Sequence, residues 1–235
     1  MTPPGTVLYT GAMTLRFLPP WAAYVAPFAL FLLLTALEGH VPPGAYPLAY
    51  AVKIALVGGL LLALRGSFPE ARPGGGGWAA ATAIGIVLGI SWAWIDMHTP
   101  HFPKLFGNRI GFNPSREIAT PLGTVLFLLV RFLGLVVVVP LVEELLYRGF
   151  LLRFVTDPDD FRRVPVGTFS ALALLVNVGL FALSHPEWLA AAIFALAQCG
   201  LLRWTRNLFA CVLMHGVTNL MLGIYILHTG QWQYW

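Results

Sequence analysis

The chain has 235 residues, of which 14 are Lys or Arg and 10 are Asp or Glu, whereas an average composition would give about 59 charged residues. Hydrophobic residues make up 58% of the sequence, and the mean hydropathy is +0.77. So few charges cannot cover a water-soluble globule, and so apolar a chain is not intrinsically disordered. The net charge of +4 comes from scattered basic residues, which excludes a nucleic-acid-binding surface.

Seven long apolar segments follow one another along the chain. Because a membrane helix needs about 20 apolar residues, they predict an all-α fold, a polytopic transmembrane helical bundle of about seven to eight membrane helices. We expect a single integral membrane domain over residues 1–235, in which residues 1–120 hold the first three helices and a polar connector. The segments are Phe17–Leu37, Tyr46–Leu64, Pro73–Ile95, Pro121–Leu152, Pro165–Ser184, Trp188–Leu202 and Asn207–Leu227.

Basic residues fall at alternate ends of these segments, nine of the 14 on one side. The positive-inside rule makes that side cytoplasmic, so the N-terminus is predicted to be cytoplasmic. The connector after the third segment carries basic residues on the opposite side and enough apolar residues for an interfacial helix. The nine are Arg16, Arg65, Arg72, Arg148, Arg153, Arg162, Arg163, Arg203 and Arg206, and the connector holds Phe102, Lys104, Leu105, Phe106, Arg109, Ile110 and Arg116.

Ionisable residues inside membrane segments are rare, and each is a candidate functional residue. Glu38 and Arg65 lie at segment ends, where we expect them to reach water. Lys53 and Arg131 lie deeper, and we expect them to snorkel to an interface or to pair internally. The other ionisable residues within segments are of a different kind.

The fourth segment leads into the sequence Glu143-Glu144-Leu145-Leu146-Tyr147-Arg148. Adjacent carboxylates point about 100° apart around a helix, so we expect Glu143 and Glu144 to have different roles. Glu144 and Arg148 are four residues apart, in the order that favours an ion pair. Glu143 has no such sequence-local partner, and it suits a general base or acid.

Two later segments contribute further polar groups. Phe181 and His185 are four residues apart, so we expect the phenyl ring to pack against the imidazole. His215 and Asn219 also share one helix face, and Gly216 allows a neighbouring helix to approach closely. Together with the carboxylates, these groups are suited to activating a water and stabilising an oxyanion.

No serine or cysteine has a recognisable nucleophile setting. Ser184 directly precedes His185 and is expected to point about 100° away from it. Cys199 and Cys211 both fall in apolar segments and are expected to be small core residues. Water is therefore the expected nucleophile.

Three motifs, in this order and on separate segments, resemble those of the CAAX-protease and bacteriocin-processing (CPBP, or ABI) family, which includes the type II CAAX prenyl endopeptidase. The resemblance implies that residues 121–227 form the protease core of an intramembrane endopeptidase in a bacterial cytoplasmic membrane. Its substrate would be a hydrophobic or lipidated peptide, and it would need no metal or other cofactor. The motifs are Glu143-Glu144-x-x-x-Arg148, Phe181-x-x-x-His185 and His215-x-x-x-Asn219.

The resemblance also implies roles for individual residues. Glu143 would be the base that activates water, and His185 would help to position that water. His215 and Asn219 would stabilise the oxyanion. The supporting residues would be Glu144, Arg148 and Phe181.

These roles require the motifs to meet at one depth. A fourth helix that ends soon after Glu143 would leave His185 offset by about 15 Å or more. We therefore expect the fourth helix to extend past Arg148 toward Phe154, and the fifth to end inside the bundle. Broken helices at membrane depth line polar cavities, so a water-filled chamber with Pro186 at its wall is predicted.

Other hypotheses fit parts of this pattern. A zinc-dependent membrane protease would use Glu143, His185 and His215 as ligands, although the sequence has no HExxH motif. A transporter or proton relay would also bury Glu and His, but the chain shows no internal repeat. An immunity or binding protein on the same bundle is a further alternative.

Overall fold

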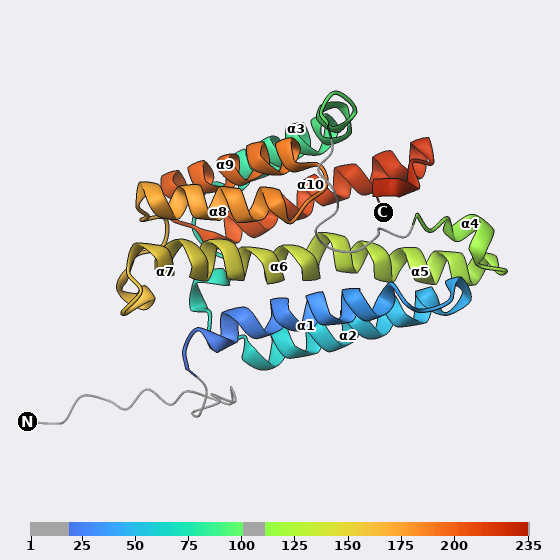
Figure 1. The fold of residues 1–235 in the computed structure, drawn as a ribbon, viewed down its shortest axis with the longest axis horizontal. Helices are drawn as coiled ribbons and strands as arrows, with labels where there is room; N and C mark the ends of the chain where they lie inside the picture. Colours follow the sequence, from blue (N-terminus) through green and yellow to red (C-terminus); the bar gives the residue numbers. More distant parts are fainter. Residues whose placement is uncertain (1–18, 101–110, 235) are drawn as a thin grey trace, which may run out of the picture.

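The computed structural model describes residues 19–100 and 111–234. Its long helices lie in three layers: the path from α5 to α7 crosses the middle, α1 and α2 lie on one side, and α3, α8, α9 and α10 lie on the other (Figure 1). The described residues contain helices and no strand, so the predicted all-α bundle is confirmed. The helices are α1 (Ala22–Glu38), α2 (Tyr46–Leu64), α3 (Trp78–Met97), α4 (Pro114–Glu117), α5 (Pro121–Leu133), η3 (Gly134–Val138), α6 (Val139–Glu144), η4 (Leu145–Leu151), α7 (Leu152–Thr156), α8 (Ala171–Leu183), α9 (Trp188–Thr205) and α10 (Leu208–Thr229), with short 3₁₀ turns at Pro43–Ala45, Pro69–Ala71, Phe161–Arg163 and Trp232–Tyr234.

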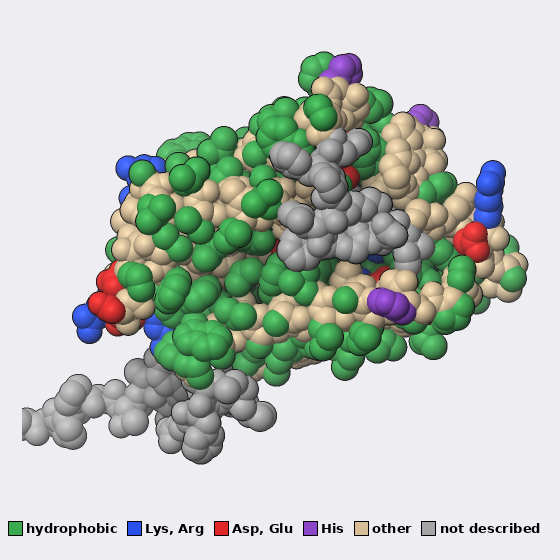
Figure 2. Space-filling model, in the orientation of Figure 1, with side chains coloured by type: hydrophobic (Ala, Val, Ile, Leu, Met, Phe, Trp, Pro, Cys, Tyr) green, Lys and Arg blue, Asp and Glu red, His purple; other side chains and the backbone are tan. Residues whose placement is uncertain are grey.

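The outer surface of the bundle is that of a membrane protein. Five helices of the described chain are long and apolar enough to cross a membrane, and α1 and α8 are shorter apolar helices of 17 and 13 residues. Hydrophobic side chains cover much of the face in Figure 2, whereas most of its charged side chains lie toward the two ends of the long axis. The chain is therefore a multi-pass membrane protein. The predicted interfacial helix at residues 102–110 and the position of Arg16 fall outside the described residues.

Side-chain caps set where several helices begin. Thr120, Ser170 and Asn207 each accept a hydrogen bond from a backbone N–H in the first turn of α5, α8 and α10, which satisfies a donor that the helix itself cannot. Asn207 Nδ2 also donates to Gly74 O and Gly76 O at 2.7 and 2.9 Å. The start of α10 is thereby tied to the loop before α3.

Loops rich in arginine meet at one end of the bundle. Arg153 pairs with Glu70 at 2.7 Å, and Arg206 donates to Thr168 Oγ1 at 2.6 Å. The grouping agrees with the predicted sidedness, and the assignment of this end to the cytoplasm stays a prediction. Arg148 was expected here and is instead fully buried within the bundle. The exposed arginines in the loops and helix ends here are Arg65, Arg72, Arg162, Arg163, Arg203 and Arg206.

A second buried polar cluster joins α1, α2 and α5. Lys53 forms an ion pair with Glu38, and its ammonium lies 4.7 Å from the centre of the Tyr50 ring. Arg131 donates to Tyr46 Oη at 3.2 Å. The prediction that Lys53 and Arg131 each pair with a group inside the bundle is thus confirmed. The expectation that Glu38 reaches water is wrong, because the Lys53 ammonium holds its carboxylate inside the bundle, where it is 5% exposed.

Two glycines let α3 and α10 pack with their backbones in close approach. A Cβ placed on Gly85 would lie 2.7 Å from Met214 O, and one on Gly89 would lie 2.7 Å from Thr218 O. Thr218 Oγ1 in turn donates to Gly85 O at 3.2 Å. Small residues four apart are a common means of close packing between membrane helices.

The substitution Gly85→Ala is expected to lower the free energy of unfolding by about 1–3 kcal/mol, because a backbone carbonyl must move to make room for the methyl group. The measurement is thermal unfolding in one detergent. Gly59→Ala on α2 is the control, since no described atom outside the neighbouring backbone of α2 lies within 4 Å of the added Cβ. Equal unfolding temperatures for the two variants would contradict the prediction.

Candidate functional site

The two adjacent carboxylates lie on an unusually long helical path, Pro121–Thr156, of 36 residues, which is about 54 Å long. They belong to α6, and the π-helical stretches η3 and η4 lie directly before and after it. Such stretches are rare and occur frequently at functional sites. The helix continues past Arg148 as predicted, and it ends at Thr156.

This extension brings the first two motifs to one depth. Ser170 N donates to Thr156 Oγ1 at 3.1 Å, so the end of α7 and the start of α8 lie side by side. Measured from this hydrogen bond, Glu143 lies about 20 Å back along the helical path that ends at Thr156. His185 lies about 20 Å forward, just past the end of α8. The fifth apolar segment forms α8, which stops at Leu183, two residues before His185.

Pro140 explains how Asn219 is bound. Val139 N donates to Gly134 O in the π-helical pattern, and Pro140 has no N–H to offer. Leu135 O therefore loses both of the donors that would normally follow it in the helix. Asn219 Nδ2 takes their place at 2.8 Å. One N–H of the Asn219 amide thus serves the backbone of the helix that carries Glu143.

The second π-helical stretch has a similar partner. Asn177, fully buried on α8, donates from Nδ2 to Tyr147 O at 2.6 Å. Leu152 N also donates to this carbonyl, five residues back. Each π-helical stretch beside the carboxylates is therefore bound by an asparagine from another helix. Sequence reasoning missed Asn177, which is the one amide side chain inside the fifth apolar segment.

Glu144 is more deeply buried than Glu143. It is 0% exposed, whereas Glu143 is 9% exposed. Glu144 Oε1 lies 3.3 Å from Arg148 Nη1 and 2.8 Å from His215 Nδ1. The predicted pair of Glu144 and Arg148 is confirmed. Charged partners and hydrogen bonds of this kind are what a buried carboxylate requires.

His215 lies between the two carboxylates. An ionised carboxylate can only accept, so Nδ1 carries the proton and donates to Glu144. Nε2 is then on the other side of the ring, 3.9 Å from Glu143 Oε2. The structure thus gives the adjacent glutamates different relations to one imidazole, as the 100° between their side chains predicts.

Phe181 joins the three motifs. Its ring stacks on His185 at 4.6 Å between centroids, the contact predicted from their spacing. The same ring contacts His215 edge-on at 6.3 Å, and the Arg148 guanidinium lies 4.7 Å from its centre. Phe194 on α9 packs against both Phe181 and His215. Aromatic rings therefore fix both imidazoles and the guanidinium.

The backbone determines how His185 is oriented. Its Nδ1 lies 2.8 Å from Phe181 O; because a carbonyl only accepts, Nδ1 donates and Nε2 carries the lone pair. The expectation that Ser184 points away from His185 is wrong, since Ser184 Oγ lies 3.0 Å from Nδ1. The chain leaves the helix at this point, so helical angles do not apply. Ser184 Oγ donates to Phe181 O at 2.7 Å, and therefore does not form a nucleophile and base pair with His185.

The zinc hypothesis finds no support in the part of the chain that the structure describes. Within residues 19–100 and 111–234, no three His, Cys, Asp or Glu side chains are grouped so that they could hold a metal ion. His215 directs Nδ1 at Glu144, and His185 directs Nδ1 at Phe181 O. Use of a metal by Glu143, His185 and His215 stays a hypothesis.

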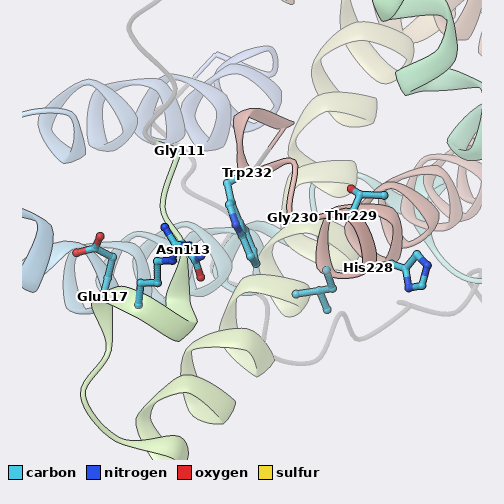
Figure 3. Close-up of a pocket in the computed structure, with 9 residues that line it drawn as sticks. Gly111, Asn113, Glu117, His228, Thr229, Gly230 and Trp232 are labelled. Atoms are coloured by element: carbon cyan, nitrogen blue, oxygen red, sulfur yellow. The ribbon is translucent and has the colours of Figure 1, made fainter.

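A cavity of about 670 Å³ lies at the far end of α10 from His215. Figure 3 shows Trp232 between Asn113 and the end of α10, with His228 and Thr229 beyond it. His215 is about 20 Å away along the helix, and none of the residues that line the cavity belongs to the three motifs. Pro186 is not among its lining residues either, so the water-filled chamber with Pro186 at its wall stays a prediction.

Comparison with known proteins supplies independent evidence. Residues 125–221 match the family model described as type II CAAX prenyl endopeptidase Rce1-like. Neither a curated protein nor a solved structure matches the chain. All three motifs fall within the matched residues. The match covers under half of the chain, and over these residues it confirms the resemblance that the three motifs predict.

Proposed function

We propose that the chain is an intramembrane endopeptidase that hydrolyses a peptide bond with water activated by Glu143. The observation that carries the proposal is the position of His215 between two carboxylates, with Nδ1 at 2.8 Å from Glu144 and Nε2 at 3.9 Å from Glu143. Glu144 is enclosed and bound by several donors, whereas Glu143 keeps some exposed surface. A general base must reach its water, so Glu143 is the better candidate.

The reaction would proceed in two stages. Glu143 takes a proton from water while the water oxygen bonds to the scissile carbonyl carbon, and the carbonyl oxygen becomes an oxyanion. Collapse of this intermediate breaks the carbon–nitrogen bond, and the proton held by Glu143 passes to the leaving amine. The water is held by a hydrogen bond to the lone pair on His185 Nε2.

The oxyanion would be stabilised by two donors of α10. His215 donates from Nε2 when both of its ring nitrogens carry a proton, and Asn219 donates the N–H that Leu135 O does not use. Phe181, Glu144 and Arg148 keep these groups in place. The protease core would be residues 121–227, and residues 1–120 would complete the single domain.

The substrate would be a hydrophobic or lipidated segment that enters from the bilayer. The description of the matched family names a prenylated CAAX sequence, in which a prenylated cysteine is followed by two aliphatic residues and a terminal residue. We propose this class of C-terminal peptide as the substrate. The N-terminus would face the cytoplasm of a bacterial cell.

The test uses the full chain in liposomes with a farnesylated CAAX peptide that carries a fluorophore and a quencher. Mass spectrometry is expected to identify a tripeptide released after the cysteine, and the peptide without farnesyl is run in parallel. Cleavage that a chelator abolishes and zinc restores would favour the zinc hypothesis instead.

Two histidines with similar local hydrogen bonds provide the test variant and its control. His185→Ala is expected to lower kcat by about 10²-fold or more, the usual contribution of such a group. His40→Ala is the control, because His40 Nδ1 also lies 2.8 Å from the carbonyl four residues back, yet the residue is exposed at the end of α1. Cleavage at the full rate by His185→Ala would refute the proposal.

A further inference from the structure

Gln198 on α9 contacts the site although it belongs to none of the three motifs. Its side chain is 0% exposed, and Nε2 lies 3.4 Å from Glu144 Oε1 and 3.1 Å from Cys211 O. Both neighbours are acceptors, so the NH₂ end of the amide must face them. Each of its two N–H groups then has one acceptor.

The two acceptors lie on either side of the hydrogen bond between His215 and Glu144. Glu144 Oε1 accepts from His215 Nδ1. Cys211 O lies one turn before His215 in α10, where an α-helix directs the N–H of His215 at this carbonyl. The Gln198 amide therefore ties the carboxylate to the turn of backbone that carries the imidazole.

Folding stability alone does not account for a glutamine here. Gln198 Oε1 is buried, and it has no hydrogen-bond partner among the residues that the structure describes. Burying a carbonyl in this way is unfavourable, and methionine would fill the same space without it. Residues that break a packing rule of this kind are expected at functional sites.

We infer that Gln198 is a positioning residue, which holds Glu144 against His215 so that Nε2 of the imidazole faces Glu143. The inference rests on the proposed function. Without the amide, Glu144 keeps its contact with Arg148 and is free to turn away from His215. The ring then loses the partner that keeps the proton on Nδ1 and directs Nε2 toward the reacting groups.

Gln198→Met tests the inference with the farnesylated fluorogenic peptide. The expected result is a kcat lower by about 10- to 100-fold, as for other groups that orient a ligand or base, with KM within about twofold of the parent value. The melting temperature in detergent is expected to be equal or higher, because the unpartnered carbonyl is gone. In ¹⁵N-histidine spectra, the His215 signal, identified by its loss in His215→Gln, should move toward a mixture of tautomers.

Leu202→Met, a buried position on the same helix, is the control and should leave kcat unchanged. An unchanged kcat in Gln198→Met would overturn the inference, and so would a loss of activity that only follows a lower melting temperature. If Gln198→Met does not fold, Gln198→Glu keeps the shape and removes a donor facing Glu144. Full activity of Gln198→Glu at neutral pH would then overturn it.

The same assays separate this inference from the proposed function. Full activity of Glu143→Gln would refute the general-base proposal, whatever Gln198 does. An inactive Glu143→Gln together with a fully active Gln198→Met would refute the positioning role alone.

Discussion

Glu143→Gln is expected to lower kcat by about 10²–10⁴-fold, because the amide cannot take a proton from water. This loss corresponds to about 3–5 kcal/mol in the activation free energy. The side chain keeps its size in a position that is 9% exposed, so folding and KM should change little. The measurement is initial rate against concentration of the farnesylated peptide, for protein that elutes as a single species in detergent.

Glu143→Asp provides the matched variant for this position. It keeps the carboxylate but withdraws it by one methylene, so we expect an activity between those of the parent and Glu143→Gln. A general base acts over about 3 Å or through one bridging water, and it is therefore sensitive to such a displacement. If Glu143→Gln and the parent cleaved at the same rate, another group would have to activate the water.

Arg148→Met is expected to lower the free energy of unfolding by about 3–5 kcal/mol, because it leaves the buried Glu144 carboxylate without its cationic partner. Both side chains are 0% exposed and lie 3.3 Å apart. The measurement is denaturant or thermal unfolding in one detergent. The double variant Arg148→Met with Glu144→Gln should lose less than the sum of the single variants, since no uncompensated charge is then buried.

An exposed ion pair gives the control for this prediction. Arg163 and Asp160 lie 2.9 Å apart, and the Arg163 side chain is 82% exposed. Arg163→Met should therefore change stability by less than about 1 kcal/mol. Equal effects at Arg148 and Arg163 would show that the buried pair does not stabilise the bundle.

Local spacing in the sequence predicted contacts within one helix well. The seven apolar segments all contain helices, and the spacing of four residues correctly joined Glu144 to Arg148 and Phe181 to His185. The prediction for Glu144 and Arg148 succeeds because side chains four apart share a helix face. His185 lies beyond the end of α8, and its ring stays against Phe181 because Nδ1 lies 2.8 Å from Phe181 O. The length of the fourth helix also followed from the requirement that Glu143 and His185 meet.

Contacts between helices were beyond the same reasoning. Gln198 and Asn177 are single amides in apolar segments, and nothing in their local sequence shows that they bind Glu144 and Tyr147 O. Glu38 was expected to reach water because it ends a segment, yet Lys53 of the next helix keeps it inside. Each of these outcomes depends on which helices become neighbours, and the spacing of residues within a helix does not contain that information.

The π-helical stretches have a consequence for insertions and deletions. A π-helical turn holds one residue more than an α-helical turn, so removing one residue from η3 would allow an uninterrupted α-helix up to Pro140. Because the wider π-helical turn takes up this extra residue, its removal would keep Glu143 on the face that meets α10. One residue removed from the regular α-helical turns of α5 would instead rotate every later residue by about 100°. The Glu143 side chain would then leave the face that meets α10, although no catalytic residue had been changed. The number of residues in the α-helical turns between Pro121 and Glu143 is thus as important to the site as the identity of its residues.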